Sequence, residues 1–249
     1  MLTPDRHQII LELLNQKNTV KIQELVEATN ASESTIRRDL DQLENNRMLT
    51  RIHGGASLRV PTNEELTMQE KSTKHLKEKL AVATYAADLV EDGDCIYLDA
   101  GSTTFEMIPH LINKDIIVVT NGLDHMNLLT ELDIRTYVLG GQIKTVTRAI
   151  IGREAEHSLK GYHFDKCFLG INGVHATNGL TTPDPEEAAI KTAALLRSEG
   201  RWVLADRSKF HRTTFAKVAD LEEAAVITND SIDAIEQFKE KTEIKVVTS

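Results

Sequence analysis

Serine and arginine side chains gather on one face of the helix that the sequence predicts after Ser32. At helical spacing the apolar residues of this stretch share one face, namely Ile36, Leu40 and Leu43. The opposite face carries Ser34, Arg37, Arg38 and Asp41. Arginine donates hydrogen bonds to base edges and to phosphates, and a serine hydroxyl can bond to either. The stretch is therefore a candidate for a helix that enters the major groove of DNA.

A solvated charged face is the simpler interpretation of the same pattern. Asp41 follows Arg37 by four residues and Arg38 by three, so it could form an ion pair with either of them on the helix surface. The stretch would then belong to a small three-helix bundle. The elements around it, described below, favour the DNA-binding interpretation.

Small and hydroxyl-bearing residues form a second candidate site. The apolar strand-like run CIYLD is followed by Ala100, Gly101, Ser102, Thr103 and Thr104, and then by the helix-like sequence FEMIPHL. Glycine lets the backbone approach a ligand closely, and the N–H groups at a helix N-terminus attract anions. The sequence therefore predicts a phosphate-binding turn.

The ends of other predicted strands carry compatible residues. These turns contain Asn121, Gly122, Gly141, Asn172 and Gly173. Lys144 and Lys191 could add positive charge, and Asp99 could either cap the Gly101–Thr104 turn or accept sugar hydroxyls. In open α/β sheets ligands bind beyond the carboxyl ends of the strands, which favours one shared effector site. Each turn is also compatible with a plain strand-to-helix connection.

Composition narrows the class of protein. The 249-residue chain has a formal net charge of −9, but residues 1–59 hold equal numbers of basic and acidic side chains. No apolar run reaches the roughly 18–20 residues that cross a bilayer, and the first residues, MLTPDRHQ, lack the apolar core of a signal peptide. The two cysteines, Cys95 and Cys167, lie in strand-like runs. We expect a cytoplasmic protein without disulfides.

Metal and nucleotide chemistry have no support in the sequence. The nine histidines do not approach cysteines or acids at metal-ligand spacing. The phosphate-loop pattern GxxxxGK[ST] and the dinucleotide pattern GxGxxG do not occur. We therefore expect neither a metal nor a cofactor.

Three helices and a wing are expected to position the serine and arginine face. Thr3-Pro4-Asp5 is a typical helix start. The first two helices have apolar stripes, formed by Ile9, Ile10, Leu13 and Leu14 and by Ile22, Leu25 and Val26. A polar break is expected at Asn15–Val20, a short turn at Thr29–Ala31, and an N-cap at Ser32. This is helix-turn-helix geometry. A strand over Met48–His53 and a turn at Gly54-Gly55 would form the wing.

The rest of the chain alternates between helical and strand patterns. Short apolar runs read CIYLD, IIVVT, TYVLGG, KCFLGI, WVLAD, AAVIT and IKVV. Helical stretches include residues 185–198, residues 231–239 and a helix whose stripe is Leu76, Leu80, Ala83 and Ala87. Apolar strands that alternate with helices predict an α/β domain with a mostly parallel, covered sheet.

The N-terminal segments RHQIILELL, VKIQELVEATNASESTIRRDLDQLE and LTRIHGGA resemble the winged helix-turn-helix of the DeoR family of bacterial transcriptional regulators. The resemblance implies a DNA-binding domain over residues 1–58, a linker over 59–74 and a sensor domain over 75–249. It places Ser32, Ser34, Thr35, Arg37 and Arg38 at the groove. It also places Arg51 and His53 on the wing, against the DNA backbone or the minor groove.

The second part also resembles the DeoR family, through LDAGSTT, VVTNG, LGG, FDKCFLGINGV, TTPDPEEAAIK and LADRSKF. The resemblance implies a fold similar to ribose-5-phosphate isomerase and CoA-transferase domains, and a phosphorylated sugar as effector. Within the family, the sequence is most similar to fructose-operon repressors of Gram-positive bacteria, which implies fructose 1-phosphate. We expect a repressor that binds operator DNA as a dimer or tetramer and releases it when the effector binds.

A sugar-phosphate isomerase is the alternative from a different functional class. Isomerisation needs a carboxylate base and a second group at the sugar carbonyl. The turn after the FLGI strand reads Asn172-Gly173-Val174-His175 and holds neither Asp nor Glu. This departure from the isomerase pattern favours a binding protein that is not an enzyme.

Overall fold

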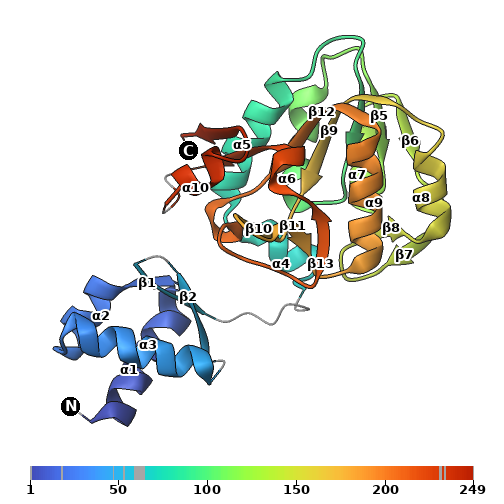
Figure 1. The fold of residues 1–249 in the computed structure, drawn as a ribbon. Coiled ribbons are helices and arrows are strands. Elements are labelled where there is room, and N and C mark those ends of the chain that lie inside the picture. Colours follow the sequence, from blue (N-terminus) through green and yellow to red (C-terminus); the bar gives the residue numbers. More distant parts are fainter. Residues whose placement is uncertain are drawn as a thin grey trace. The chain divides into compact units, whose positions relative to one another are not determined.

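The computed structural model describes residues 2–17, 19–46, 48–52, 54–58, 65–229, 232 and 234–248. The chain divides into two compact units, Met1–Pro61 and Thr62–Ser249, which we describe separately (Figure 1). The second unit thus begins earlier than the domain boundary expected at residue 75. Residues 65–74, expected to be linker, pack as part of it.

The first unit holds three helices and a small sheet. The helices are α1 (Thr3–Lys17), α2 (Ile22–Thr29) and α3 (Glu33–Asn45). The antiparallel strands are β1 (Thr19–Lys21), β2 (Leu49–Ile52) and β3 (Gly55–Leu58), in the order β1-β3-β2. The predicted helix-turn-helix and wing are confirmed. The polar break expected at Asn15–Val20 instead contributes β1 to the wing sheet.

Local sequence explains the turns of this unit. Asn30 ends α2 in the left-handed conformation (φ 53°), which asparagine tolerates better than most residues. The Ser32 side chain accepts a hydrogen bond from the Thr35 N–H at the start of α3, so the predicted N-cap is confirmed. In the wing, Gly54 has φ +78°, whereas Gly55 already belongs to β3. A Cβ on Gly55 would lie 2.2 Å from the Val20 carbonyl oxygen, so the close pairing with β1 requires glycine.

A buried ion pair joins α1 to α3. The Arg6 guanidinium donates to both carboxylate oxygens of Asp39, over 2.5 and 2.9 Å, and both side chains are buried. Apolar side chains from all three helices and the sheet surround the pair and form the core of the unit. Asp39 therefore lies on the buried side of α3, which leaves the opposite side of the helix to solvent.

The second unit is built on a seven-stranded parallel sheet with the order β15-β14-β12-β9-β4-β5-β6. The predicted parallel α/β sheet is confirmed. Its strands are β4 (Cys95–Leu98), β5 (Ile117–Thr120), β6 (Thr136–Val138), β9 (Phe164–Gly170), β12 (Ser198–Leu204), β14 (Ala225–Asn229) and β15 (Ile244–Val247).

Two small antiparallel sheets, which the apolar runs did not predict, lie beside the main one. One has the order β10-β11-β13 and the other pairs β7 with β8. Their bounds are β7 (Gln142–Lys144), β8 (Ala149–Ile151), β10 (Gly173–His175), β11 (Gly179–Thr182) and β13 (Ala216–Ala219). Gly173 thus lies on a strand, not in the turn expected for it, and Lys144 lies at the end of β7.

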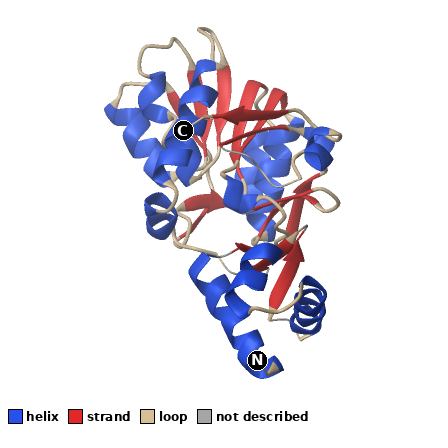
Figure 2. Cartoon of the chain, turned by 90° about the vertical axis from the view of Figure 1, so that its left-hand side faces the viewer, coloured by secondary structure: helices blue, strands red, loops and turns tan. Residues whose placement is uncertain are grey.

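Helices flank the strands of the second unit (Figure 2). They are α4 (Met68–Thr73), α5 (Leu76–Asp88), α6 (Ser102–Phe105), α7 (Leu123–Glu131), α8 (Arg153–Leu159), α9 (Pro185–Leu196) and α10 (Glu236–Lys239). Single 3-10 turns span Ile108–Leu111, Arg207–Lys209 and Leu221–Glu223. The continuous helix expected for FEMIPHL is therefore replaced by the end of α6 and a 3-10 turn.

Two apolar cores cover the two faces of the main sheet. On β4, Ile96 and Leu98 pack with α5, whereas Tyr97 packs in the core that includes α9, as the two-residue period of a strand requires. The face of α5 differs from the expected one. Its Leu76 and Leu80 are exposed, and Lys79 takes a buried position instead. This places a lysine inside the second unit.

Candidate functional site

The outer side of α3 presents the residues expected to read DNA. Ser34, Arg37 and Arg38 are exposed, and Thr35 is half-buried. Arg37 donates to the Glu33 carboxylate over 2.6 and 3.0 Å, whereas Arg38 has no polar partner among the described residues. An exposed pair on one helix turn costs little to separate, so Arg37 can exchange Glu33 for a phosphate or a base edge.

The wing lies against the end of α3. The Arg51 guanidinium forms an ion pair with Asp41, and the Arg51 backbone N–H donates to Glu44. The solvated-face interpretation expected Asp41 to pair with Arg37 or Arg38. Asp41 instead pairs with Arg51 on the wing. His53 lies outside the described residues.

The turn after β4 has two kinds of hydroxyl. The Thr104 Oγ1 donates to the backbone oxygens of Asp99 and Gly101 and accepts from the Gly101 N–H, so it shapes the turn. The Ser102 and Thr103 hydroxyls have no hydrogen-bond partner among the described residues, although both side chains are buried. Both hydroxyls are therefore available to donate to a ligand and accept from it.

A buried ion pair lies beside this turn. Lys191 on α9 donates to the Asp99 carboxylate, which also accepts the Gly170 N–H over 3.0 Å. Burial lowers the pKa of Lys191, but the Asp99 and Glu187 carboxylates outweigh burial and raise it, so the ammonium stays charged. The predicted residues Asp99 and Lys191 are therefore brought together, and each neutralises the other.

Lys144 is the centre of an acidic cluster. Its ammonium contacts Glu65, Asp184 (2.7 Å) and Glu187 (3.1 Å). Burial lowers its pKa, but the hydrogen bond to Asp184 and the other carboxylates raise it above the ordinary value. Glu65, which belongs to the expected linker, is held in addition by Lys71 over 3.1 Å. A ligand could use Lys144 only by displacing a carboxylate.

Five of the predicted effector residues serve the framework. The Asn121 amide accepts from the Tyr97 hydroxyl and the Ala100 N–H and donates to the Ile150 carbonyl. The Asn172 amide oxygen accepts from the Thr182 hydroxyl. Close packing fixes the glycines, because a Cβ would lie 2.4 Å from a neighbouring atom at Gly122, 2.6 Å at Gly141 and 2.4 Å at Gly173.

The clash at Gly122 would be with the His125 ring, which packs against the turn that follows β4. The buried His125 Nε2 lies 3.1 Å from the Thr104 Oγ1, and its Nδ1 has no partner. Burial lowers the pKa of His125 to about 3, so the ring is neutral. It therefore packs against the turn without adding positive charge.

Cationic side chains that the sequence did not bring together lie on elements that pack against α6 or interact with its neighbours. Helix α4 lies against α6, and the charges of Lys71, Lys79, Lys209, Asp206 and Glu106 act on one another. Lys79 is buried and donates only to the Lys71 carbonyl oxygen, without an ion pair among the described residues. Burial lowers its pKa to about 8. Sequence reasoning missed Lys79, because it lies in a predicted helix whose apolar stripe was assigned to other residues.

Two family models match the chain over most of its length. The DeoR-like helix-turn-helix domain matches residues 6–62, and the DeoR C terminal sensor domain matches residues 74–231. The chain belongs to the DeoR family. The family expected from the sequence motifs is confirmed, and with it the role of a DNA-binding transcriptional regulator.

Curated DeoR-family relatives match along their whole length. An uncharacterised HTH-type transcriptional regulator of Bacillus subtilis, named FruR, is 49% identical over 249 residues, which is 99% of each chain. A lactose phosphotransferase system repressor of Staphylococcus epidermidis is 34% identical over 249 residues, or 98% of each chain. The corresponding repressor of Streptococcus mutans is 34% identical over 251 residues, covering 98% of this chain and 99% of its own.

Solved structures resemble part of this DeoR-family chain. Ribose 5-phosphate isomerase A of Methanocaldococcus jannaschii aligns with 53% of each chain, with a TM-score of 0.40 and 23% identity. The isomerase of Plasmodium falciparum aligns with 54% of this chain and 52% of its own, with a TM-score of 0.40 and 19% identity.

Within the residues described, no helix is both long and apolar enough to cross a lipid bilayer. Nor do three or more His, Cys, Asp or Glu side chains of these residues come together in a group that could hold a metal ion.

Proposed function

We propose that this chain is a repressor whose affinity for operator DNA falls when a phosphorylated sugar binds to the second unit. The observation that carries the proposal is Lys79 on α5, a buried ammonium group without a carboxylate partner among the described residues. Helix α5 packs against α6, where two hydroxyls have no partner within the same residues. A phosphate would supply the missing negative charge, and Ser102 and Thr103 would donate to its oxygens.

The sugar part of the effector would lie toward Asp99 and Lys191. A buried carboxylate accepts hydrogen bonds from sugar hydroxyls, and the ammonium beside it donates to hydroxyl or carbonyl oxygens. Asp99 follows β4, and Lys191 reaches it from α9, so both groups lie at the carboxyl edge of the main sheet. This is the edge where open α/β sheets bind ligands.

Fructose 1-phosphate is the first candidate for the effector. The relative with 49% identity is named FruR, and the 34% identical relatives are named as repressors of a lactose phosphotransferase system. These names point to sugar uptake that yields phosphorylated sugars. The motifs GDCIYLDAGSTT and TTPDPEEA resemble those of fructose-operon repressors.

Binding of DNA and of the effector would be coupled through a dimer or tetramer. A tenfold to hundredfold loss of operator affinity requires about 1.4–2.8 kcal/mol of coupling free energy. Because operator half-sites have a fixed spacing, a small change in the distance between two helix-turn-helix units supplies a loss of this size.

A thermal-shift screen with phosphorylated sugars tests the effector site. The set contains fructose 1-phosphate, fructose 1,6-bisphosphate, tagatose phosphates and glycerol 3-phosphate, with unphosphorylated fructose as the control. A ligand that binds only the folded protein raises its melting temperature. We expect a shift with one phosphorylated sugar, and release of operator DNA by the same compound in a gel-shift assay. No shift with any of them would contradict the proposal.

The Thr103→Val variant locates the phosphate. Valine keeps the shape of the side chain and removes only the hydroxyl, so we expect a smaller thermal shift and unchanged operator binding without effector. Thr130→Val is the matched control, because Thr130 lies on the exposed side of α7. An unchanged thermal shift in Thr103→Val would place the phosphate elsewhere.

We infer that the site binds a sugar phosphate without converting it. After β9 the Asn172 amide and Gly173 are engaged in packing, and the His175 Nδ1 accepts two backbone N–H groups. The Asp99 carboxylate is bound to Lys191. A free base is therefore not positioned at this turn. An isomerase assay with phosphorylated pentoses and hexoses tests this inference, and turnover would overturn it.

A further inference from the structure

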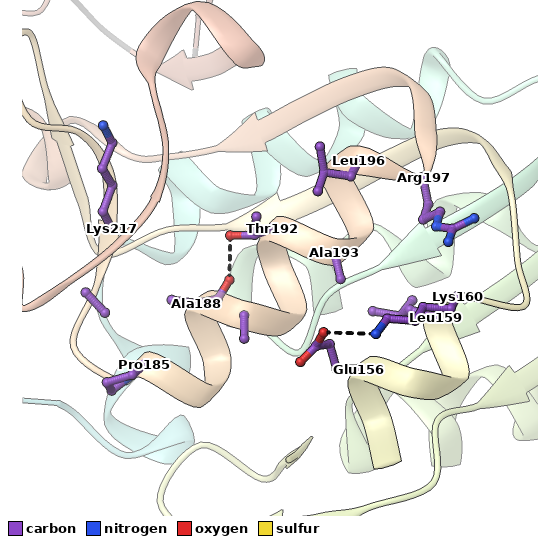
Figure 3. A pocket seen from close by; sticks show the side chains of 12 residues that line it. Glu156, Leu159, Lys160, Pro185, Ala188, Thr192, Ala193, Leu196, Arg197 and Lys217 are labelled. Atoms are coloured by element: carbon purple, nitrogen blue, oxygen red, sulfur yellow. Dashed lines mark hydrogen bonds and ion pairs between the residues drawn. The ribbon is translucent and has the colours of Figure 1, made fainter. Parts of the chain in front are cut away.

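The hollow along α9 in the second unit offers a ligand little chemical selection (Figure 3). It has a volume of about 510 Å³ and a mostly apolar lining that includes Leu159, Ala188 and Ala193. The Thr192 hydroxyl in it already donates to the Ala188 carbonyl oxygen over 2.9 Å. The exposed side of α3 in the first unit, by contrast, presents paired charges whose chemistry can distinguish one base from another.

Glu33, the first residue of α3, is an acid on the side of the helix that carries the arginines. Its side chain is 59% exposed and that of Arg37 is 50% exposed. The Arg37 Nε and Nη2 groups both donate to the Glu33 Oε1, over 3.0 and 2.6 Å, whereas Oε2 accepts no hydrogen bond among the described residues. Asp41, four residues beyond Arg37, is bound to Arg51. Within the described residues, Glu33 is therefore the only carboxylate that Arg37 contacts.

The hydroxyl groups at the start of α3 are bonded to one another. The Ser32 Oγ lies 3.0 Å from the Ser34 Oγ and 2.8 Å from the Thr35 Oγ1, and it accepts the Thr35 N–H over 3.3 Å. In a helix-turn-helix domain, the N-terminal residues of the recognition helix contact base edges in the major groove. Glu33 lies in this turn with one carboxylate oxygen unengaged by the described residues, although the sequence motifs pointed only to its neighbours.

Transfer of Arg37 to DNA would leave the Glu33 carboxylate without its counter-ion. The phosphates of DNA repel such a charge, so a hydrogen-bond donor of the DNA has to take the place of the guanidinium. In the major groove, the donors are cytosine N4 and adenine N6. Adenine holds the N7 acceptor beside N6, and an ionised carboxylate can only accept hydrogen bonds, so cytosine is the base that fits.

We propose that Glu33 is a specificity-determining residue for operator DNA and selects cytosine at one position of each half-site. Its carboxylate accepts a hydrogen bond from cytosine N4 when Arg37 moves to the DNA. At any other base the carboxylate stays unpaired in the groove, which weakens binding to that sequence. This proposal rests on the proposed function, because it places α3 in the major groove, but it does not depend on the effector.

Selection of DNA from a random-sequence pool by the full-length protein, followed by gel shifts with the selected DNA, tests the proposal. We expect the wild type to prefer cytosine about tenfold at one position of the half-site. Glu33→Gln keeps the size of the side chain, and its amide both donates and accepts, which suits adenine N7 and N6. This variant should prefer adenine at that position, and Glu33→Ala should show no preference there. Preferences at the other positions should not change.

Glu27→Gln is the matched control, because Glu27 is an exposed acid on α2 and its replacement changes the net charge by the same amount. It should keep the preference for cytosine, and thermal unfolding shows that each variant is folded. Unchanged base preferences in both Glu33 variants would overturn the proposal. Tighter binding of these variants to every sequence, without a change in preference, would also overturn it, since Glu33 would then act by repulsion alone. A wild-type chain that selects no common sequence would reject the proposed function together with this proposal.

Discussion

The Lys79 side chain is buried, and its ammonium donates only to the Lys71 carbonyl oxygen among the described residues. Burial holds its pKa at about 8, against an ordinary value of 10.5, with Asp206 and Glu106 acting to raise it and Lys209 and Lys71 to lower it. Within the described residues it forms no ion pair. A bound phosphate would therefore favour the charged form and raise the pKa again.

This arrangement predicts proton uptake on effector binding. Near pH 8 Lys79 is only partly protonated in the free protein, and binding of an anion completes its protonation. The affinity should fall as the pH rises above 8. Calorimetric titration with fructose 1-phosphate at pH 8, in buffers of different ionisation enthalpy, measures the protons taken up. Lys79→Met should abolish the uptake, and uptake that persists in this variant would assign it to another group.

The same residue predicts an effect on stability. Because the pKa of Lys79 is lowered in the folded chain, the folded state binds this proton less tightly than the unfolded state, and the charged lysine destabilises the fold below pH 8. Stability gained from Lys79→Met should thus be largest at neutral pH and should disappear as the pH approaches 10.5. Urea unfolding of both proteins at pH 7 and pH 10 gives the comparison.

The two arginines of α3 lead to a separate prediction for DNA. Replacement of Arg38 by alanine should weaken operator binding by about 1–3 kcal/mol, or tenfold or more, because no ion pair among the described residues competes for this side chain. Arg37→Ala should reduce the operator affinity less, since Arg37 must first break its ion pair with Glu33 before it can bind DNA. Gel shifts with operator DNA measure both, with Arg153→Ala on the exposed surface of α8 as control. Normal binding by both variants would remove them from the DNA-reading face.

At the scale of elements, the position of α3 depends on a buried ion pair. Arg6 anchors Asp39 from α1, with His7 contributing a third contact at 3.2 Å. Asp39→Ala leaves the Arg6 charge without its partner, a change that costs about 3 kcal/mol or more for buried pairs. We expect the first unit to unfold at a lower temperature and operator binding to be lost, while the thermal shift of the second unit with effector is kept. Equal melting of variant and wild type would contradict this.

The pair also makes the first unit sensitive to acid. Burial raises the pKa of Asp39, but the hydrogen bonds from Arg6 and His7 outweigh burial and hold it below its ordinary value of 3.8. A carboxylate of this kind contributes its full stability above pH 3.8 and loses it as the pH falls toward the lowered pKa. Acid unfolding followed by circular dichroism should show this loss in the wild type and not in Asp39→Ala.

Elements that depend on local patterns were predictable, and contacts between distant segments were not. The Ser32 cap, the apolar stripe of α3 and the parallel strands follow from spacing within a few residues. Arg6 and Asp39 are 33 positions apart, and Lys191 and Asp99 are 92 positions apart. A single sequence carries no signal for such pairs. The candidate site was therefore predicted as a set of turns, whereas its charge balance came only from the structure.

At the scale of the whole molecule, Glu65 is the first residue of the second unit that the structure describes. It follows the segment that connects the two units. Lys71 and Lys144 hold its side chain, and Lys144 also contacts Glu187, whose charge acts on Lys191. A row of alternating charges thus runs from Asp99 in the proposed effector site to the first described residue of the unit. An effector that draws Lys191 away from Asp99 would disturb this row.

The Glu65→Gln variant tests this connection. We expect it to bind effector with normal affinity, measured by calorimetry, while the effector changes its operator affinity less than threefold. Glu131→Gln, an exposed residue at the end of α7, is the control and should respond like the wild type. A full response in Glu65→Gln would mean that the signal takes another route.

The ion pair between α1 and α3 also bears on protein engineering. A chimera that borrows the residues of α3 from a relative, in order to redirect the regulator to a new promoter, transfers whatever stands at position 39 of the donor. Arg6 of the recipient would then lie against the donor's residue in place of Asp39. Such grafts should succeed when positions 6 and 39 travel together and should yield unstable proteins when they are separated.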